Sequence, residues 1–354
     1  MKSLFFLGAG ASVPFGIPTM TKMVSDFEER TRKPNYGLGY VVQEIKNRLR
    51  NYKSFDIEAL ITVLQDIVDY PNIADSIFNH PSLHFYTPND YQTFASSVQS
   101  FGQKYHNEAK QILGDVKLFL TESCNFTNTP FELYKELFSE GIKYDFNYKQ
   151  ELAEHRKDIY NCIFTTNYDL VLEAYCTHEG LQYENGEIHG GVLDIASSNQ
   201  SLFESGYNVH QIFKLHGSIN WYTDDRGCMR WISEPVITGK TTALGHKVER
   251  ELLLYPAIFK YTFREPFYTM FHHLKDRLIK SSFCFIVGYS FRDDDILGIF
   301  QDAMMKNLNL HLVLIDPSAE MIKDTRFSKY KDRVQCISEP FNMTAIEQLK
   351  RIKV

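Results

Sequence analysis

An apolar run that breaks into a glycine-containing loop stands at the start of this chain of 354 residues. The run Leu4-Phe5-Phe6-Leu7 is typical of a buried strand, and Gly8-Ala9-Gly10-Ala11-Ser12 follows it directly. Two glycines one residue apart permit a tight turn and a close approach of the backbone to a ligand. If a helix begins here, its first amides form an anion site suited to a pyrophosphate.

The loop departs from the dinucleotide-binding fingerprint in two ways. Val13 stands where the third glycine is expected. No acidic residue closes a second strand about 20 residues further on. The loop by itself therefore leaves two interpretations open, a nucleotide site and an ordinary turn between a strand and a helix.

Three distant segments share the pattern of a β-type run that ends in small or polar residues. They are Ile163-Phe164-Thr165-Thr166-Asn167-Tyr168-Asp169, Lys214-Leu215-His216-Gly217-Ser218 and Phe285-Ile286-Val287-Gly288-Tyr289-Ser290-Phe291. In a parallel sheet the carboxyl ends of the strands form the rim of a ligand crevice. The pattern predicts that these segments and the first loop meet at one sheet edge.

In this order, the four motifs resemble the sirtuin-like NAD-hydrolase family of bacterial antiphage defence proteins. The resemblance implies an α/β fold, in which a Rossmann-like parallel sheet has helices on both faces, with NAD as the substrate. Sirtuin deacetylases are similar at G-A-G-A-S, G-I-P, T-T-N-Y-D, H-G and G-Y-S. They also carry a four-cysteine zinc module, which the six scattered cysteines here, without any C-x-x-C, cannot build. We therefore expect no zinc module and no required metal.

The resemblance implies catalytic roles for Asn167, His216 and Asp169. Asn167 would hold a ribose hydroxyl or orient the attacking water, and Asp169 would accept a hydrogen bond from the nicotinamide amide. His216 would transfer a proton, because its pKa range suits neutral pH. From the residue types alone, the alternatives are an Asx turn at Asn167, a helix cap at Asp169 and a purely structural role for His216.

The same resemblance implies a nucleotide-binding set drawn from several loops. Gly288 would let the phosphates approach closely, Ser290 offers a hydroxyl, and Asp316 would accept both hydroxyls of the adenosine ribose. One of Asp293, Asp294 and Asp295 is expected to cap the next helix. Binding of a divalent ion by this acidic run is an open alternative. The full expected set is Gly8, Ala9, Gly10, Ala11, Ser12, Ile17, Pro18, Thr166, Gly288, Tyr289, Ser290 and Asp316.

Hydrophobic periodicity divides the chain into a Rossmann-like domain, residues 1–33 and 156–354, and a helical insertion, residues 34–155. Within the insertion, Ile57, Leu60, Ile61 and Leu64 recur on one helical face behind a possible cap at Asp56. Thr19 is expected to cap a helix that runs to about Arg30. The pattern predicts an irregular segment over residues 180–210 and a small hairpin with its turn around 224–227. In the tail from residue 318, it predicts a final helix near 343–352.

Charge and composition narrow the classes of partner. The formal net charge of −6 argues against a large nucleic-acid surface, so direct nucleic-acid binding is not expected. No stretch approaches a membrane span, and the scattered cysteines favour a reducing cytoplasm. Family precedent implies control by self-assembly into a homo-oligomer, or by a HerA-type ATPase or a short Argonaute.

The function expected on this basis is that of an NAD glycohydrolase, which releases nicotinamide and ADP-ribose and depletes NAD to stop phage growth. One alternative is an NAD-dependent protein deacylase or ADP-ribosyltransferase that uses the same cleft. Another is a module that senses NAD or ADP-ribose without chemistry. The loss of the Asp-Phe-Arg that follows G-I-P in deacetylases, replaced here by Thr19-Met20-Thr21, puts an acyl-lysine platform in doubt.

Overall fold

The structure, a computed structural model, describes residues 4–32, 39–49, 56–69, 88–142, 161–188, 191–193, 209–255 and 265–352. The chain divides into two compact units. The first comprises Met1–Ile17, Cys124–Leu254 and Tyr261–Val354, and the second comprises Pro18–Ser123 and Tyr255–Lys260. The predicted domain boundaries at 33/34 and 155/156 lie outside the described residues and stay predictions.

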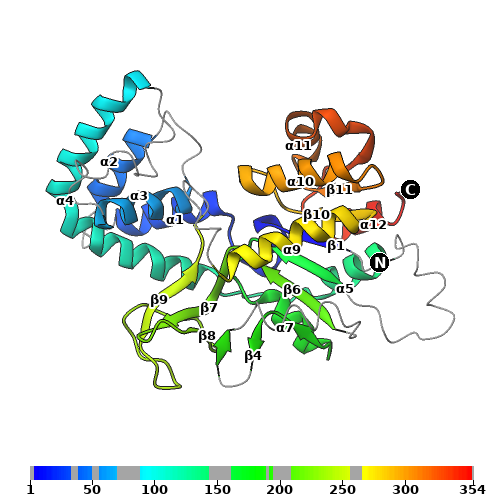
Figure 1. The fold of residues 1–354 in the computed structure, drawn as a ribbon, viewed down its shortest axis with the longest axis horizontal. Coiled ribbons are helices and arrows are strands. Elements are labelled where there is room, and N and C mark those ends of the chain that lie inside the picture. The colour runs from blue at the N-terminus through cyan, green and yellow to red at the C-terminus, as the bar shows by residue number, and fades with distance from the viewer. Residues whose placement is uncertain are drawn as a thin grey trace. The chain divides into compact units, whose positions relative to one another are not determined.

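The first unit contains a seven-stranded sheet with the order β12-β11-β10-β1-β2-β6-β3, in which all neighbours pair in parallel (Figure 1). The strands are β1 (Leu4–Leu7), β2 (Cys162–Thr165), β3 (Tyr183–Glu184), β6 (His210–Lys214), β10 (Phe283–Val287), β11 (His311–Ile315) and β12 (Val334–Ile337). From β1 the sheet continues through β2 and β6 to the edge strand β3, and from β10 it continues in the opposite direction through β11 to β12. The strand order therefore reverses between β1 and β10, which is where open α/β sheets bind ligands.

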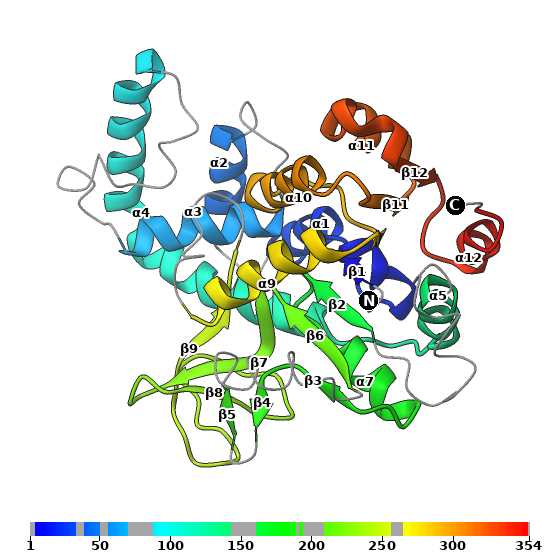
Figure 2. The ribbon, with the colours of Figure 1, turned by 45° about the vertical axis from the view of Figure 1, so that its right-hand side comes forward.

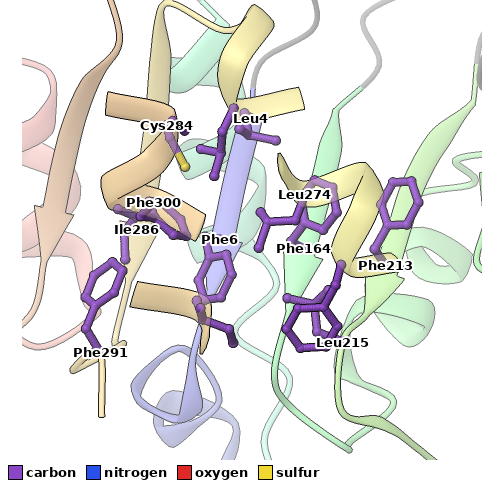
Figure 3. Packing of buried hydrophobic residues seen from close by; sticks show 14 of the residues in the cluster. Leu4, Phe6, Phe164, Phe213, Leu215, Leu274, Cys284, Ile286, Phe291 and Phe300 are labelled. Atoms are coloured by element: carbon purple, nitrogen blue, oxygen red, sulfur yellow. The ribbon is translucent and has the colours of Figure 1, made fainter. Parts of the chain in front are cut away.

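Helices cover both faces of this sheet, as the sequence predicted. Leu4 and Phe6 belong to a buried cluster with α9 (Phe267–Lys280), α10 (Asp294–Lys306) and α11 (Ala319–Arg326). In Figure 3, Phe6 lies near Phe300 of α10, and the two rings meet edge to face at 5.3 Å. Phe5 points to the other face, where its ring meets Phe138 of α5 (Glu132–Ile142) at 4.9 Å.

Two further helices extend the cover on the side of Phe5. Tyr175 of α7 (Val171–His178) packs against Phe138 of α5 at 5.6 Å. Tyr134 of α5 packs against Phe341 at 5.7 Å, beside the start of α12 (Met343–Leu349). The alternation of side chains along β1 is what lets one strand serve both layers of the core.

A second, antiparallel sheet with the order β4-β5-β8-β7-β9 stands apart from the parallel strands within the first unit (Figure 2). Its strands are β4 (Glu187–Ile188), β5 (Val192–Leu193), β7 (Gly217–Asp224), β8 (Met229–Trp231) and β9 (Val248–Leu253). The predicted hairpin is confirmed as the β7–β8 pair. The expectation of an irregular segment over 180–210 was incomplete, because β3, β4 and β5 are each two residues long and too short to show a period.

The described part of the second unit is helical. It consists of α1 (Met20–Thr31), α2 (Gly39–Leu49), α3 (Ile57–Asp69) and α4 (Pro88–Ser123). The two predicted caps are confirmed, since Lys22 N donates to Thr19 Oγ1 (3.4 Å) and Ala59 N donates to Asp56 Oδ1 (3.0 Å). Ile57, Leu60, Ile61 and Leu64 are fully buried. Among the helices of the described ranges, none has the length and apolarity needed to cross a bilayer.

The carboxyl-terminal tail holds more structure than its sequence suggested. Helix α11 and strand β12 precede the predicted final helix, which the structure places at Met343–Leu349. Strand β12 buries Val334 and Ile337 but leaves Gln335 and Cys336 half-buried. A short strand of this kind forms no continuous apolar run, which explains why the pattern missed it.

Candidate functional site

The loops that follow β1 and β10 meet backbone to backbone. Gly8 N donates to Val287 O and Gly10 N donates to Gly288 O, both at 2.9 Å. A Cβ added at Gly10 would lie 2.6 Å from the Cα of Gly288, which itself has a φ of +62°. The glycines at this edge are therefore required for the close approach of two loops, and not only for the approach of a ligand.

The expected row of helix amides after the first loop is not present. Two short 3-10 turns, η1 (Ala9–Ala11) and η2 (Val13–Phe15), follow β1, and α1 begins only at Met20. Ala11 N donates to Gly8 O (2.9 Å) and Ser12 N donates to Ala9 O (3.1 Å). Together with Gly8 and Gly10, four of the five loop amides are thus used within the protein, and a pyrophosphate site at this loop stays a prediction.

Ser12, Asn167 and Asp169 form one buried hydrogen-bonded group, as the pattern of strand-end motifs predicted. Ser12 Oγ donates to Asp169 Oδ2 (2.7 Å), and Asn167 Nδ2 donates to Ser12 Oγ (2.8 Å). The parallel pairing of β1 with β2 brings these residues together, because Leu7 lies opposite Thr165 at the ends of the two strands.

The side chain of Asn167 is fixed in orientation. Its Nδ2 donates to Gly8 O (2.9 Å) as well as to Ser12, and its backbone N donates to Thr165 Oγ1 (3.0 Å). Within the described residues, Oδ1 of Asn167 accepts no hydrogen bond. The side chain is only 7% exposed. An amide anchored through its nitrogen presents its oxygen as an acceptor for a hydroxyl or a water.

Both carboxylate oxygens of Asp169 accept bonds from the protein itself. Oδ2 accepts from Ser12, and Oδ1 accepts from Val171 N (3.1 Å) at the start of α7. The alternative of a helix-capping role is therefore present in the structure, while the contact with nicotinamide stays a prediction. Burial raises the pKa of Asp169, and Lys214 and the Ser12 bond act in the opposite direction.

A buried charged pair that the sequence analysis did not identify supports this segment. Lys214, at the end of β6, donates through Nζ to Asp169 O and to Glu173 Oε1, the second at 3.1 Å. Lys214 is 1% exposed and Glu173 is 7% exposed. The sequence did contain a signal for this pair, since Lys214 stands at the end of an apolar strand directly before Leu215-His216. A charge buried at such a position requires a partner of opposite charge.

His216 lies between β6 and β7 and is buried. Its Nε2 is 3.2 Å from Oδ2 of Asp293. A carboxylate only accepts hydrogen bonds, so Nε2 carries a proton in this pair, and Nδ1 is the basic nitrogen of the neutral ring. Asp293 also caps α10, because its Oδ1 accepts from Asp295 N (3.0 Å) and Ile296 N (3.2 Å). The cap was predicted for this acidic run, but the bond to His216 was not.

Tyr168 joins the segment of Asn167 to that of His216. It stands between Asn167 and Asp169 in the chain and is 1% exposed. Its ring centroid is 6.4 Å from that of His216. Thus the three residues expected to be catalytic belong to neighbouring segments of the first unit.

The other expected ligand residues lie in less enclosed positions. Tyr289 packs on Phe6 (4.8 Å) and Phe291 (4.9 Å), so its ring contributes to the core. Ser290 is exposed. Asp316, at the end of β11, accepts from Ser318 N (2.8 Å), and burial raises the pKa of its carboxyl.

The remaining expected ligand residues flank the loop. Thr166 N donates to Leu7 O (3.2 Å), and Ile17 N donates to Ser12 O (3.4 Å). Pro18 is the first residue of the second unit. Contacts of all these residues with a nucleotide stay predictions.

The described residues contain no group of three or more His, Cys, Asp and Glu side chains placed to hold a metal ion. Four of the cysteines are buried as free thiols, at 124, 162, 176 and 284. Of these, Cys162 lies in β2 and Cys284 in β10.

In comparison with known protein families, residues 161–335 match the model of the SIR2-like domain. Similar solved structures include a mutant Sir2 homologue bound to ADP-ribose, at 9% identity and a TM-score of 0.45, covering 98% of this chain and 90% of that chain. Another is a Sir2 homologue bound to NAD, at 13% identity and a TM-score of 0.44, covering 98% of this chain and 88% of that chain. No curated protein matches the sequence.

Proposed function

We propose that this chain, whose residues 161–335 are similar to a SIR2-like domain, is an NAD glycohydrolase. The observation that carries the proposal is the anchored amide of Asn167, whose nitrogen is bound to Gly8 and Ser12 while its oxygen faces no donor within the described residues. An acceptor fixed in this way is suited to a ribose hydroxyl or to a water molecule that attacks the ribose.

In this reaction the bond between ribose C1′ and the nicotinamide nitrogen breaks, and its electron pair leaves with the nicotinamide, which becomes neutral. Water forms the new bond to C1′ and releases one proton, so the products are nicotinamide and ADP-ribose. We assign Asn167 to orient the ribose or the water. His216 accepts the proton at Nδ1 while Asp293 holds Nε2, an arrangement in which the carboxylate fixes the tautomer of the base.

Asp169 is assigned a positioning role in addition to the predicted contact with nicotinamide. Its bonds to Ser12 and Val171 tie the loop after β1 to the start of α7. Gly8 to Ser12, Ile17, Pro18, Thr166, Gly288 to Ser290 and Asp316 remain the proposed nucleotide contacts.

The defence role rests on the resemblance of the ordered motif set. On the same basis, we assign control of the activity to a homo-oligomer, or to a HerA-type ATPase or short Argonaute partner, in the cytoplasm. Reconstitution with each candidate partner and NAD tests this assignment. A partner that leaves the rate of NAD loss unchanged is excluded as an activator.

The test of the activity is nicotinamide release by the purified full chain incubated with NAD, alone and with each candidate partner. Asn167→Ala and His216→Ala should each lower the rate by about 100-fold or more, since orientation of the reactants and acid–base catalysis each contribute on that scale. His246→Ala is the matched control, because His246 bonds to Tyr222 in the antiparallel sheet (3.2 Å). Unchanged rates in both site variants would overturn the proposal, and binding of NAD without turnover would favour the sensing module.

A further inference from the structure

A closed ring of hydrogen bonds connects the segment of Asn167 to the segment of His216. Tyr168 Oη donates to Leu254 O (2.9 Å), and Leu254 N donates to His216 O (2.8 Å). From His216 the chain enters β7, where Ile219 N donates back to Tyr168 O (3.1 Å). Ser218 Oγ also donates to Tyr168 O (3.4 Å).

Every member of this ring is buried. Tyr168 is 1% exposed, Leu254 is 5% exposed and His216 is 3% exposed. A buried tyrosine hydroxyl that donates to a buried carbonyl holds both groups in place, because neither has water as a replacement. The ring thus fixes the distance between the two segments independently of the strand pairing within the parallel sheet.

The geometry points to Tyr168 as a positioning residue that sets the placement of His216 relative to Asn167 through the backbone of Leu254. Tyr168 is linked to the His216 segment twice, indirectly by its hydroxyl through Leu254 and directly by its carbonyl oxygen through Ile219 N. This inference rests on the proposed NAD cleavage, because it requires that Asn167 and His216 act on the same bond. Misplacement of a catalytic group by about 1 Å can lower a rate by about 100-fold.

Tyr168→Phe removes the hydroxyl and keeps the ring. The expected result with NAD is a fall in kcat of about 10-fold to 100-fold, with KM close to the wild-type value, because the nucleotide contacts are left in place. Tyr222→Phe is the matched control. Tyr222 lies on β7, is fully buried and also bonds through its hydroxyl, to His246 Nδ1 (3.2 Å).

Each variant removes the hydroxyl of a buried tyrosine, so a purely structural role predicts small changes in kcat in both. A large fall in kcat in Tyr168→Phe alone supports the positioning role. Equal kcat values in the two variants would overturn it.

Hydrogen–deuterium exchange separates failure of this inference from failure of the proposed function. In Tyr168→Phe the amide of Leu254 should exchange faster, and in Tyr222→Phe it should not. If the wild-type chain releases no nicotinamide, the proposed function fails, and the ring is judged by exchange alone. Unchanged exchange at Leu254 would then exclude the ring as the link between the two segments.

Discussion

Between β1 and β10, two loops meet through bare backbone, whereas between β2 and β6 the neighbouring segments meet through buried polar and charged side chains. On the first side, Gly10 and Gly288 leave no room for a Cβ. On the second side, the buried Lys214 donates hydrogen bonds to the side chain of Glu173 and to the backbone oxygen of Asp169. The loops at this edge of the sheet are therefore held by backbone contacts on one side and by buried polar and charged groups on the other. Substitutions on the two sides should lower the stability by different amounts.

The largest effect is expected on the charged side. Lys214→Met leaves Glu173 buried without its cation and removes a donor from Asp169 O, so the free energy of unfolding should fall by about 3–5 kcal/mol. Lys275→Met is the matched control, because Lys275 and Asp302 form an exposed pair (3.0 Å) that should contribute about 0–1 kcal/mol.

Urea unfolding measures the free energy of unfolding of Lys214→Met and of Lys275→Met. The double variant Lys214→Met with Glu173→Leu should recover part of the loss, because Glu173 is then no longer a buried charge without its cation. A double variant less stable than Lys214→Met would contradict the interpretation that Lys214 stabilises the protein by neutralising Glu173.

A smaller effect is expected on the glycine side. Gly10→Ala places a Cβ against backbone atoms of Gly288, which cannot move as a flexible side chain can, so the loss should be about 1–3 kcal/mol. Gly298→Ala, in α10 with no heavy atom within 4 Å of the added Cβ, should instead stabilise by about 0.5–1 kcal/mol. Thermal or urea unfolding compares the two. Equal stability of both variants would mean that the loops separate without cost.

The smallest effect is expected from pH, because Lys214 and Ser12 partly offset the burial of Asp169. Burial raises the pKa of Asp169 in the folded chain above its ordinary value of about 3.9. The protonated form is therefore favoured by folding, and this stability is present below about pH 3.9 and is lost as the pH rises through the folded pKa.

The measurement is urea unfolding over a pH series for the wild type and Asp169→Asn. The stability of the wild type relative to the variant should decline as the pH rises through that range. A difference that stays constant would show that Lys214 and Ser12 fully offset burial, and one that grows with pH would show that they outweigh it.

The two sides also differ in how far the sequence predicted them. The strand-end motifs placed Ser12, Asn167 and Asp169 together, because parallel strands end at a common edge and each motif carries its own polar residues. The sequence did not predict that Gly10 faces Gly288, since a glycine pattern does not say whether a ligand or another loop approaches it. Nor did it pair His216 with Asp293, because strands β7, β8 and β9, helix α9 and strand β10 separate the two residues in the chain.

Cys228 stands in the turn of the β7–β8 hairpin and is the one exposed thiol among the described cysteines. Strand β7 runs from this turn back to Gly217, directly after His216. The native protein thus carries its own attachment point for a maleimide dye, and the fluorescence of that dye would report changes at the histidine end of the strand without an engineered label.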